Sequence, residues 1–440
     1  MIVMKFGGSS LADAQQIHKA LQIVRSRTDR SPVVVCSAHK GITDALIAAT
    51  RLAVGGTPNV EPVVARQRSI LQDLGCPPDL LDGLFAQLED LLRGVALLRE
   101  ASPRTLDFVQ GFGERMSVRA IADYFTRNGL PASPHDAFDL GFITDANFGA
   151  ARPVADFRAR AAAAFAALPA GVVPIVTGFV GKTECGDLTT VGRNGSDYTA
   201  TCFAAALDAT ECEIWTDTDG VMTADPRVVA GAKSIPEMSF AEASELAYYG
   251  GRVLHPSTLL PAIERNVPVR VLNTNRPEHP GTVITRDGSP SERQVTSITY
   301  KERQAVLTIE STRMLGQVGF LAKIFDEIGR AGLVIDMIST SEVTVSMTTG
   351  QDGPNLEQAL ALLSSFGRAT VERGKTIVCV VGKNVRNARG LSARVFAALE
   401  RVETNVEMIS MGANKINLSF LIDDREVQKV IPELHRALFG

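Results

Sequence analysis

Short, uniformly apolar segments alternate with helix-like segments through the first 275 residues of this chain. The apolar runs at residues 1–5 and 33–36 are each followed by a turn and then by apolar side chains at helical spacing. Apolar strands without polar alternation are typical of parallel sheets that helices cover on both faces. The pattern predicts an α/β fold of three layers, αβα, around a mainly parallel sheet. Ligands of such sheets gather at the carboxyl ends of the strands.

The last third of the chain contains an internal repeat. Residues 277–297 are rich in Pro, Gly, Ser and charge, and they predict a boundary near residue 295. Beyond it, GFLAKIF and DMIS return as GLSARVF and EMIS at one offset of 71 residues. Two copies of a strand–helix–strand–strand–helix unit favour two ferredoxin-like domains. The second copy ends in a helix with no closing strand, so one copy shares a strand with the other or is inserted in it. The predicted domains are 1–295, 296–373 and 374–440.

Composition narrows the class of protein. The formal net charge is −4 and no long basic run occurs, which argues against nucleic acid and anionic membranes as partners. The six cysteines form no CxxC pair, a usage that favours free thiols in a reducing cytosol and a cytoplasmic location. Residues 161–181 carry no charge, but prolines and glycines interrupt them, so we interpret them as a helix end, a turn and a buried strand.

Two glycine-rich segments point to phosphate chemistry. KFGGSS, residues 5–10, places Lys5 at the end of an apolar strand and before a Gly-Gly turn, where bare backbone N–H groups suit an anion. TTVGRNGSD, residues 189–197, places Arg193 between two glycines and Asp197 at a helix start. Each has a structural explanation, because lysine beside a glycine turn is common and an anion suits any helix N-terminus. Together they favour an enzyme that transfers a phosphoryl group; the GxxxxGK[ST] spacing of P-loop enzymes is absent.

Other polar residues follow predicted strands or lie on predicted helices. Ser37 and Thr43 follow a buried strand, although Thr43 also suits a helix N-cap. Glu114 lies within a helix, where it is either a solvated side chain or a carboxylate for an ammonium group. Asp217, Asp219 and Asp225 follow another strand. They would hold Mg²⁺ or a nucleotide, or they form Asx turns.

The order of the motifs is more specific than any one of them. K-F-G-G-S-S, S-A-x-x-G-I-T, G-E-R-M-S, T-G-F, G-R-x-G-S-D-Y-T-A, W-T-D-x-x-G, T-A-D-P-R and V-L-H-P occur in succession. This series resembles the aspartate kinase family, within the amino-acid kinase superfamily. The C-terminal repeat resembles the paired regulatory ACT domains of those enzymes. The resemblance implies that Mg-ATP phosphorylates the β-carboxylate of L-aspartate to 4-phospho-L-aspartate, the first step in the biosynthesis of the aspartate-derived amino acids.

The resemblance also implies roles for particular residues. The catalytic residues would be Lys5, Asp197 and Arg252. The aspartate pocket would contain Thr43, Glu114, Phe179, Arg193 and Ser196, with Glu114 on the α-ammonium and Arg193 on the α-carboxylate. ATP would contact Lys5, Gly7, Gly8, Ser37, Thr216, Asp217, Met222, Asp225, Arg227 and Arg252. No residue is assigned to a metal, since Mg²⁺ would arrive with ATP.

The ACT resemblance implies an amino-acid effector, lysine or threonine. The matching positions are Met314, Gly319, Phe320, Leu321, Asp336, Ser341 and Glu342, with Asp336 attracting an ammonium group. A homodimer or higher homo-oligomer through the ACT domains is expected, since symmetric dimers are the commonest assemblies. The chain departs from the family pattern at Arg252, where Lys is usual, at Met222, where Tyr is common, and at His39 and Lys40, where small residues are usual.

The sequence also leaves two other functions open. One is a kinase whose acceptor is a different carboxylate, such as glutamate or an N-acylated amino acid, and the other is a non-catalytic amino-acid sensor. Glu114 favours an acceptor with a free amino group, and the presence of Lys5, Arg193, Asp197 and Asp217 favours catalysis.

Overall fold

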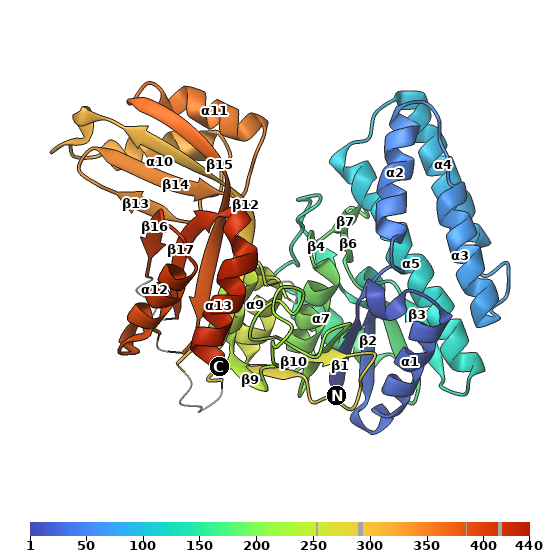
Figure 1. The fold of residues 1–440 in the computed structure, drawn as a ribbon. Coiled ribbons are helices and arrows are strands. Elements are labelled where there is room, and N and C mark those ends of the chain that lie inside the picture. Colours follow the sequence, from blue (N-terminus) through green and yellow to red (C-terminus); the bar gives the residue numbers. More distant parts are fainter. Residues whose placement is uncertain (252–253, 289–293, 384, 412–415) are drawn as a thin grey trace. The chain divides into compact units, whose positions relative to one another are not determined.

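The computed structural model describes residues 1–251, 254–288, 294–383, 385–411 and 416–440 (Figure 1). By packing, the chain divides into two units. The first comprises Met1–Val221, Ser234–Phe240 and Val253–Ser289, and the second comprises Met222–Lys233, Ala241–Arg252 and Pro290–Gly440. The domain limits at residues 295 and 373 stay predictions.

The first unit is built on an eight-stranded sheet. In spatial order its strands are β3 (Ala132–His135), β5 (Val173–Thr177), β2 (Pro32–Cys36), β1 (Ile2–Phe6), β8 (Cys212–Thr216), β10 (Val269–Asn273), β11 (Thr282–Thr285) and β9 (Glu237–Ser239). The first six run parallel, and β11 is antiparallel to β10. A separate small sheet contains β4 (Ile143–Thr144), β6 (Val180–Thr183) and β7 (Leu188–Thr190). The prediction of a mainly parallel sheet is confirmed.

Helices lie on both faces of the large sheet. The helices of this unit are α1 (Ala14–Arg25), α2 (Ile42–Val54), α3 (Glu61–Leu74), α4 (Asp82–Leu98), α5 (Pro103–Arg127), α6 (Phe157–Ala166), α7 (Gly195–Ala206) and α9 (Pro256–Arg265). The short 3₁₀ helices of the chain are η1 (Gly8–Leu11), η2 (Thr28–Arg30), η3 (Ala137–Leu140), η4 (Thr312–Met314), η5 (Val385–Asn387) and η6 (Asp424–Glu426). Helices α2, α3 and α4 lie side by side and extend away from the sheet (Figure 1).

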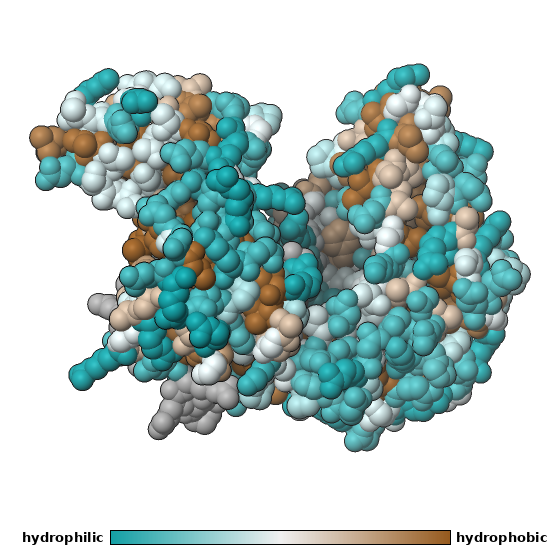
Figure 2. Space-filling model, in the orientation of Figure 1, coloured by the Kyte–Doolittle hydropathy of each residue, from teal (hydrophilic) through white to brown (hydrophobic). Residues whose placement is uncertain are grey.

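The alternation of side chains along β1 assigns the two faces. Met4 and Phe6 point into the larger core with α1, where Phe6 stacks on Trp215 at 6.0 Å between ring centroids. Lys5, between them in sequence, points to the other face, which α7 covers. The apolar side of α1 is buried, and its outer surface is hydrophilic (Figure 2).

The second unit contains one six-stranded sheet. Its order is β13 (Ile338–Thr340), β14 (Thr344–Thr349), β12 (Ser297–Glu310), β15 (Arg368–Val381), β17 (Asn417–Asp423) and β16 (Met408–Ser410). Its helices are α8 (Phe240–Tyr248, which begins in the first unit), α10 (Phe320–Arg330), α11 (Pro354–Leu363), α12 (Leu391–Arg401) and α13 (Val427–Phe439).

Strands β12 and β15 serve two separate cores in this sheet. The later part of β12, with Leu307 and Ile309, packs with α10 and α11. The earlier part, with Ile298, packs with α12 and α13. The second core also takes in Ala224 and Val229, from a segment far earlier in the sequence, and Ile298 N–H donates to Thr223 O at 2.9 Å. Two ferredoxin-like halves therefore share one continuous sheet, as the fold class predicts.

All six cysteines lie among the described residues and all are free; five are buried and Cys185 is exposed. In the described ranges, no helix combines the length and the apolar character that crossing a bilayer would require.

Candidate active site

Lys5 and Asp197 form an ion pair at the carboxyl end of the sheet. The Nζ of Lys5, near the end of β1, lies 2.5 Å from Oδ1 of Asp197, in the first turn of α7. Their side chains are 11% and 7% exposed. The two glycine-rich segments, about 190 residues apart in sequence, are thus neighbours in space.

The Gly7–Gly8 turn places bare backbone beside this ammonium. Gly7 N–H and Ser10 Oγ–H both donate to the carbonyl oxygen of Trp215, at 3.2 and 3.3 Å. A methyl group on Gly7 would lie 3.2 Å from Lys5 Nζ, and one on Gly8 would lie 3.1 Å from Ala38 O. Glycine therefore keeps the space beside Lys5 free of side chains, which is the fit that a phosphate group requires.

Glu114 is a buried carboxyl group with one oxygen in use. Its side chain projects from α5, and the residue is 3% exposed. Oε1 accepts a hydrogen bond from Ala38 N–H at 3.1 Å, whereas Oε2 has no partner among the described residues. Burial raises the pKa of Glu114 from 4.5 to about 8. A ligand ammonium group at Oε2 would reverse that shift, since an adjacent positive charge favours the carboxylate.

Ser37 and Thr43 flank the segment that contacts Glu114. Ser37 is the first residue after β2 and Thr43 lies in the first turn of α2; both are partly exposed. Ser37 N–H donates to Phe6 O at 3.1 Å, so the turn after β2 adjoins the end of β1.

The turn after β5 packs against the start of α7. Phe179 has a left-handed backbone, with φ of 65°, and its N–H donates to Thr199 Oγ1 at 3.0 Å. A methyl group on Gly178 would lie 2.5 Å from the Cβ of Ser196, which is buried. Phe179 and Ser196 therefore lie close together at the amino end of the helix that carries Asp197.

Arg193 is exposed just before α7. In the described part of the chain it has no acidic partner within ion-pair distance, unlike most arginines of this unit. The charge of Arg193 nevertheless acts on His255, the N-cap of α9. Burial is the main cause that lowers the pKa of His255, and the positive charges of Arg193 and Arg152 lower it further. An exposed, unpaired guanidinium can bind a carboxylate in a bidentate manner.

The turn after β8 contains two acidic side chains with different surroundings. Asp219 accepts hydrogen bonds from Asn273 at 2.7 Å and from Arg276 at 2.6 Å. Asp217 is exposed, and its Oδ1 accepts a hydrogen bond from the hydroxyl of Thr216 at 3.2 Å. Thr216 and Asp217 are therefore the polar groups of this turn that remain open to a ligand.

Three of the residues expected at the nucleotide belong to the second unit. Asp225 and Arg227 bind each other, through Arg227 Nε and Asp225 Oδ1 at 3.0 Å, and Tyr300 O–H donates to Asp225 at 3.3 Å. Met222 O accepts from Ser297 Oγ–H at 2.8 Å. Arg252 lies outside the described residues. Within those residues, no three His, Cys, Asp or Glu side chains gather as a metal site.

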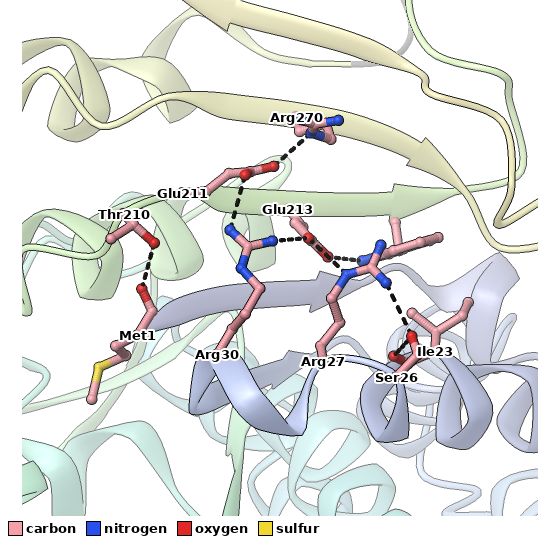
Figure 3. Close-up of polar contacts among 10 residues, drawn as sticks. Met1, Ile23, Ser26, Arg27, Arg30, Thr210, Glu211, Glu213 and Arg270 are labelled. Carbon is pink, nitrogen blue, oxygen red and sulfur yellow. Dashed lines mark hydrogen bonds and ion pairs between the residues drawn. The ribbon is translucent and has the colours of Figure 1, made fainter.

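A network of charged side chains, which no motif indicates, lies at the amino ends of the same strands (Figure 3). Glu213, which is 1% exposed, accepts from Trp215 Nε1–H at 2.9 Å, Arg27 at 3.1 Å and Arg30 at 3.2 Å. Arg30 also binds Glu211, which binds Arg270 at 2.6 Å. The available signal was a glutamate inside an apolar strand, since such a residue needs a partner.

The residues expected at an effector lie around the first half of the six-stranded sheet. Asp336 is nearly buried and pairs with Lys301 Nζ at 2.6 Å, and its Oδ1 has no partner in the described part of the chain. Ser341 Oγ accepts from Thr344 N–H at 3.1 Å. Phe320 is a core residue, whereas the exposed or partly exposed members of the set are Met314, Gly319, Leu321 and Glu342. Lys301 is not among the predicted residues, because no motif includes it.

Comparisons with known proteins agree with this geometry. Residues 1–273 match the amino acid kinase family and residues 378–438 match an ACT domain. Chloroplastic aspartokinase 1 of Arabidopsis thaliana is 37% identical over 99% of this chain and 80% of its own. Lysine-sensitive aspartokinase 3 of Escherichia coli is 36% identical over 100% and 99%. The crystal structure of E. coli aspartokinase III with aspartate and ADP aligns over all of both chains, with a TM-score of 0.86 at 33% identity.

Proposed function

The chain belongs to the aspartokinase family, and on that premise we propose that it catalyses transfer of the γ-phosphoryl group of ATP to the β-carboxylate of L-aspartate. A bond forms between a carboxylate oxygen and the γ-phosphorus, the bond to the leaving oxygen of ADP breaks, and 4-phospho-L-aspartate results. The observation that carries the proposal is the Lys5–Asp197 ion pair beside a glycine turn, at the same sheet edge as Glu114.

The chemistry needs positioning and charge neutralisation rather than a general base. The attacking carboxylate is already a nucleophile, so the protein has only to align it with the phosphorus and stabilise the equatorial oxygens. Lys5 supplies a positive charge at that place, and Asp197 orients its ammonium group. Mg²⁺ bound to ATP would neutralise further charge on the phosphates. The backbone of Gly7 and Gly8, with Ser37, Thr216 and Asp217 at neighbouring strand ends, forms the nucleotide side.

Glu114 and Arg193 account for selection of an amino acid. Glu114 Oε2 accepts the α-ammonium group, and Arg193 binds the α-carboxylate, while Thr43, Phe179 and Ser196 complete the pocket. The buried Glu114 favours an acceptor with a free amino group over an N-acylated one, because only an ammonium group compensates for the ionisation of that carboxyl. The finer assignments of Met222, Asp225, Arg227 and Arg252 to ATP belong to the same proposal.

Regulation by an amino acid is proposed for the second unit. The E. coli relative has been crystallised with lysine and aspartate, in a form that aligns with a TM-score of 0.78. In this chain Asp336 has one oxygen on Lys301 and one without a described partner, which suits a second ammonium group. We propose lysine as effector, or threonine, and a homodimer or higher homo-oligomer in a reducing, cytoplasmic setting.

A hydroxylamine-trapping assay tests the reaction. The enzyme with Mg-ATP is supplied with aspartate, glutamate or N-acetylaspartate, and acyl phosphate is detected as hydroxamate. We expect product from aspartate alone, and none from the Lys5→Ala variant. Product from N-acetylaspartate would contradict the role of Glu114. Absence of product from every acid, with no difference between wild type and Lys5→Ala, would favour the non-catalytic sensor.

A further inference from the structure

The segment between β2 and α2, residues 37–41, connects the two halves of the active site. Ala38 N–H donates to Glu114 Oε1 at 3.1 Å. The carbonyl oxygen of the same residue faces the glycine turn, where a methyl group on Gly8 would lie 3.1 Å away. The position of this short segment therefore decides which oxygen of Glu114 is occupied and which remains available to a ligand.

His39 anchors this segment to a helix that has no other part in the site. Its Nδ1 lies 3.0 Å from Oε1 of Gln67, on α3, so Nδ1–H donates to the amide oxygen. His39 is 1% exposed and Gln67 is fully buried. The carbonyl oxygen of His39 also accepts from Ile42 N–H at 3.0 Å, the first residue of α2. The contact thus joins the segment, α2 and α3 at one point.

Stability alone does not account for this pair. The Nε2 atoms of both His39 and Gln67 are buried without a partner among the described residues. Burial also lowers the pKa of His39 to about 4, so the ring is neutral and the hydrogen bond gains nothing from charge. Two apolar side chains of similar volume would leave no polar atom unsatisfied. The distinctive property of the pair is instead its location. It joins residue 39 to α3, next to the Ala38 N–H that binds Glu114.

We propose that His39 and Gln67 are positioning residues for the amino-acid substrate. They hold residues 37–41 so that Ala38 N–H occupies one oxygen of Glu114 and leaves the other to the ammonium group of aspartate. The inference rests on the proposed function and concerns the same pocket, but neither side chain needs to touch the substrate. Loss of the His39–Gln67 hydrogen bond is expected to weaken the binding of aspartate more than the binding of ATP. The glycine turn on the ATP side keeps its own hydrogen bonds to the Trp215 carbonyl.

Steady-state kinetics of a short variant series tests this. His39→Leu and Gln67→Leu are each expected to raise KM for aspartate about tenfold, with kcat and KM for ATP changed less than about threefold. The double variant is expected to be no worse than either single one, because both remove the same contact. His39→Asn is expected to restore most of the affinity, since its amide can donate from near the position of Nδ1.

The matched control is Thr50→Val in α2. Thr50 is 1% exposed and its hydroxyl donates to Leu46 O at 2.9 Å, so the variant loses a buried hydrogen bond two turns beyond the segment. It should lower the unfolding midpoint without changing KM for aspartate. The inference is overturned if folded His39→Leu keeps KM for aspartate within twofold, or if both KM values rise equally.

Calorimetric titration with aspartate separates this inference from the proposed function. Turnover by the wild type establishes the function, whatever the variants do. A wild type that binds aspartate without turnover would remove the kinase proposal and still test the anchor, through the ratio of Kd values. A wild type that neither turns over nor binds aspartate would overturn both.

Discussion

The two ends of the large parallel sheet differ in how completely their charged groups are paired. At the amino ends of the strands, Glu213 is shared by Arg27, Arg30 and the indole N–H of Trp215, so both carboxylate oxygens are in use (Figure 3). At the carboxyl ends, Glu114 has a buried oxygen with no described partner, and the charges of Arg193 and Asp217 are exposed. The same strands thus join a closed network to an open one.

This difference suggests that the charges at one end mainly stabilise the fold, whereas those at the other end mainly serve ligand binding. A buried charge whose hydrogen bonds are complete holds elements together and has nothing left for a ligand. A buried charge that lacks some of its hydrogen bonds costs free energy until a ligand supplies them. Such groups are typical of functional sites, where pKa values are often perturbed. Substitutions at the amino ends should therefore change the free energy of unfolding, and those at the carboxyl ends should change catalysis.

The largest effect is expected for Lys5→Ala. Loss of one preorganised charge at the transferring phosphate should lower kcat about 10³-fold, or about 4 kcal/mol. The unfolding midpoint should fall as well, because Asp197 is left buried without its partner, but the variant should stay folded at the assay temperature. Initial rates and thermal unfolding measure both. A variant that is inactive only because it is unfolded at the assay temperature would contradict the division between the two ends.

The matching substitution at the other end is Glu213→Ala. It leaves the indole N–H of the fully buried Trp215 without its acceptor and Arg27 without its ion pair. We expect a loss of about 3 kcal/mol in the free energy of unfolding. Denaturant unfolding measures this, and kcat should stay within about threefold of wild type.

Glu213→Gln provides the control for this experiment. The amide keeps an acceptor for Trp215 but loses the charge for the arginines, so its loss should be smaller. Equal losses for the two variants would mean that the ion pairs, rather than the hydrogen bond to the indole, dominate at this end.

Glu114→Gln is expected to raise KM for aspartate about 30-fold, or about 2 kcal/mol, because a neutral amide replaces the partner of the ammonium group. The stability of the folded protein, in contrast to its affinity for aspartate, should improve in this variant. The folded protein keeps the Glu114 proton up to about pH 8, whereas the unfolded chain loses it near 4.5. The folded state therefore binds more protons between those values, and the wild type loses stability as pH rises through them.

The amide has no such dependence. The midpoint of ligand-free Glu114→Gln should thus rise relative to wild type between pH 5 and pH 8. A constant difference across this range would contradict the raised pKa.

The sequence was sufficient for the parts of the site that lie within motifs. The order of the motifs implied that residues 5–10 and 189–197 belong to one site, and the uniform strands predicted a mainly parallel sheet. The partnership of Glu213 with Arg27 and Arg30 depends on how the η2 turn meets β8, which no local pattern records. Nor does any pattern indicate that Ala224 and Val229 pack in the core of the C-terminal sheet, because their apolar character suits either unit.

The smallest effect is expected at Asp336, which combines features of both ends. Its Oδ2 is paired with Lys301 Nζ at 2.6 Å, as in the closed network, and its buried Oδ1 has no described partner, as in the open site. The ammonium group of Lys301 repels a second ammonium group. Lys301→Met removes that repulsion and leaves Asp336, which also interacts with the hydroxyl of Tyr248, without a cation partner.

We therefore expect the lysine concentration for half inhibition to fall about fivefold in Lys301→Met, or about 1 kcal/mol. Inhibition curves measured at fixed aspartate and ATP give this ratio, and Asp336→Asn should weaken inhibition instead. If Lys301→Met also weakened inhibition, the ion pair would be a support that the effector needs, and Asp336 would belong with the closed network of Glu213.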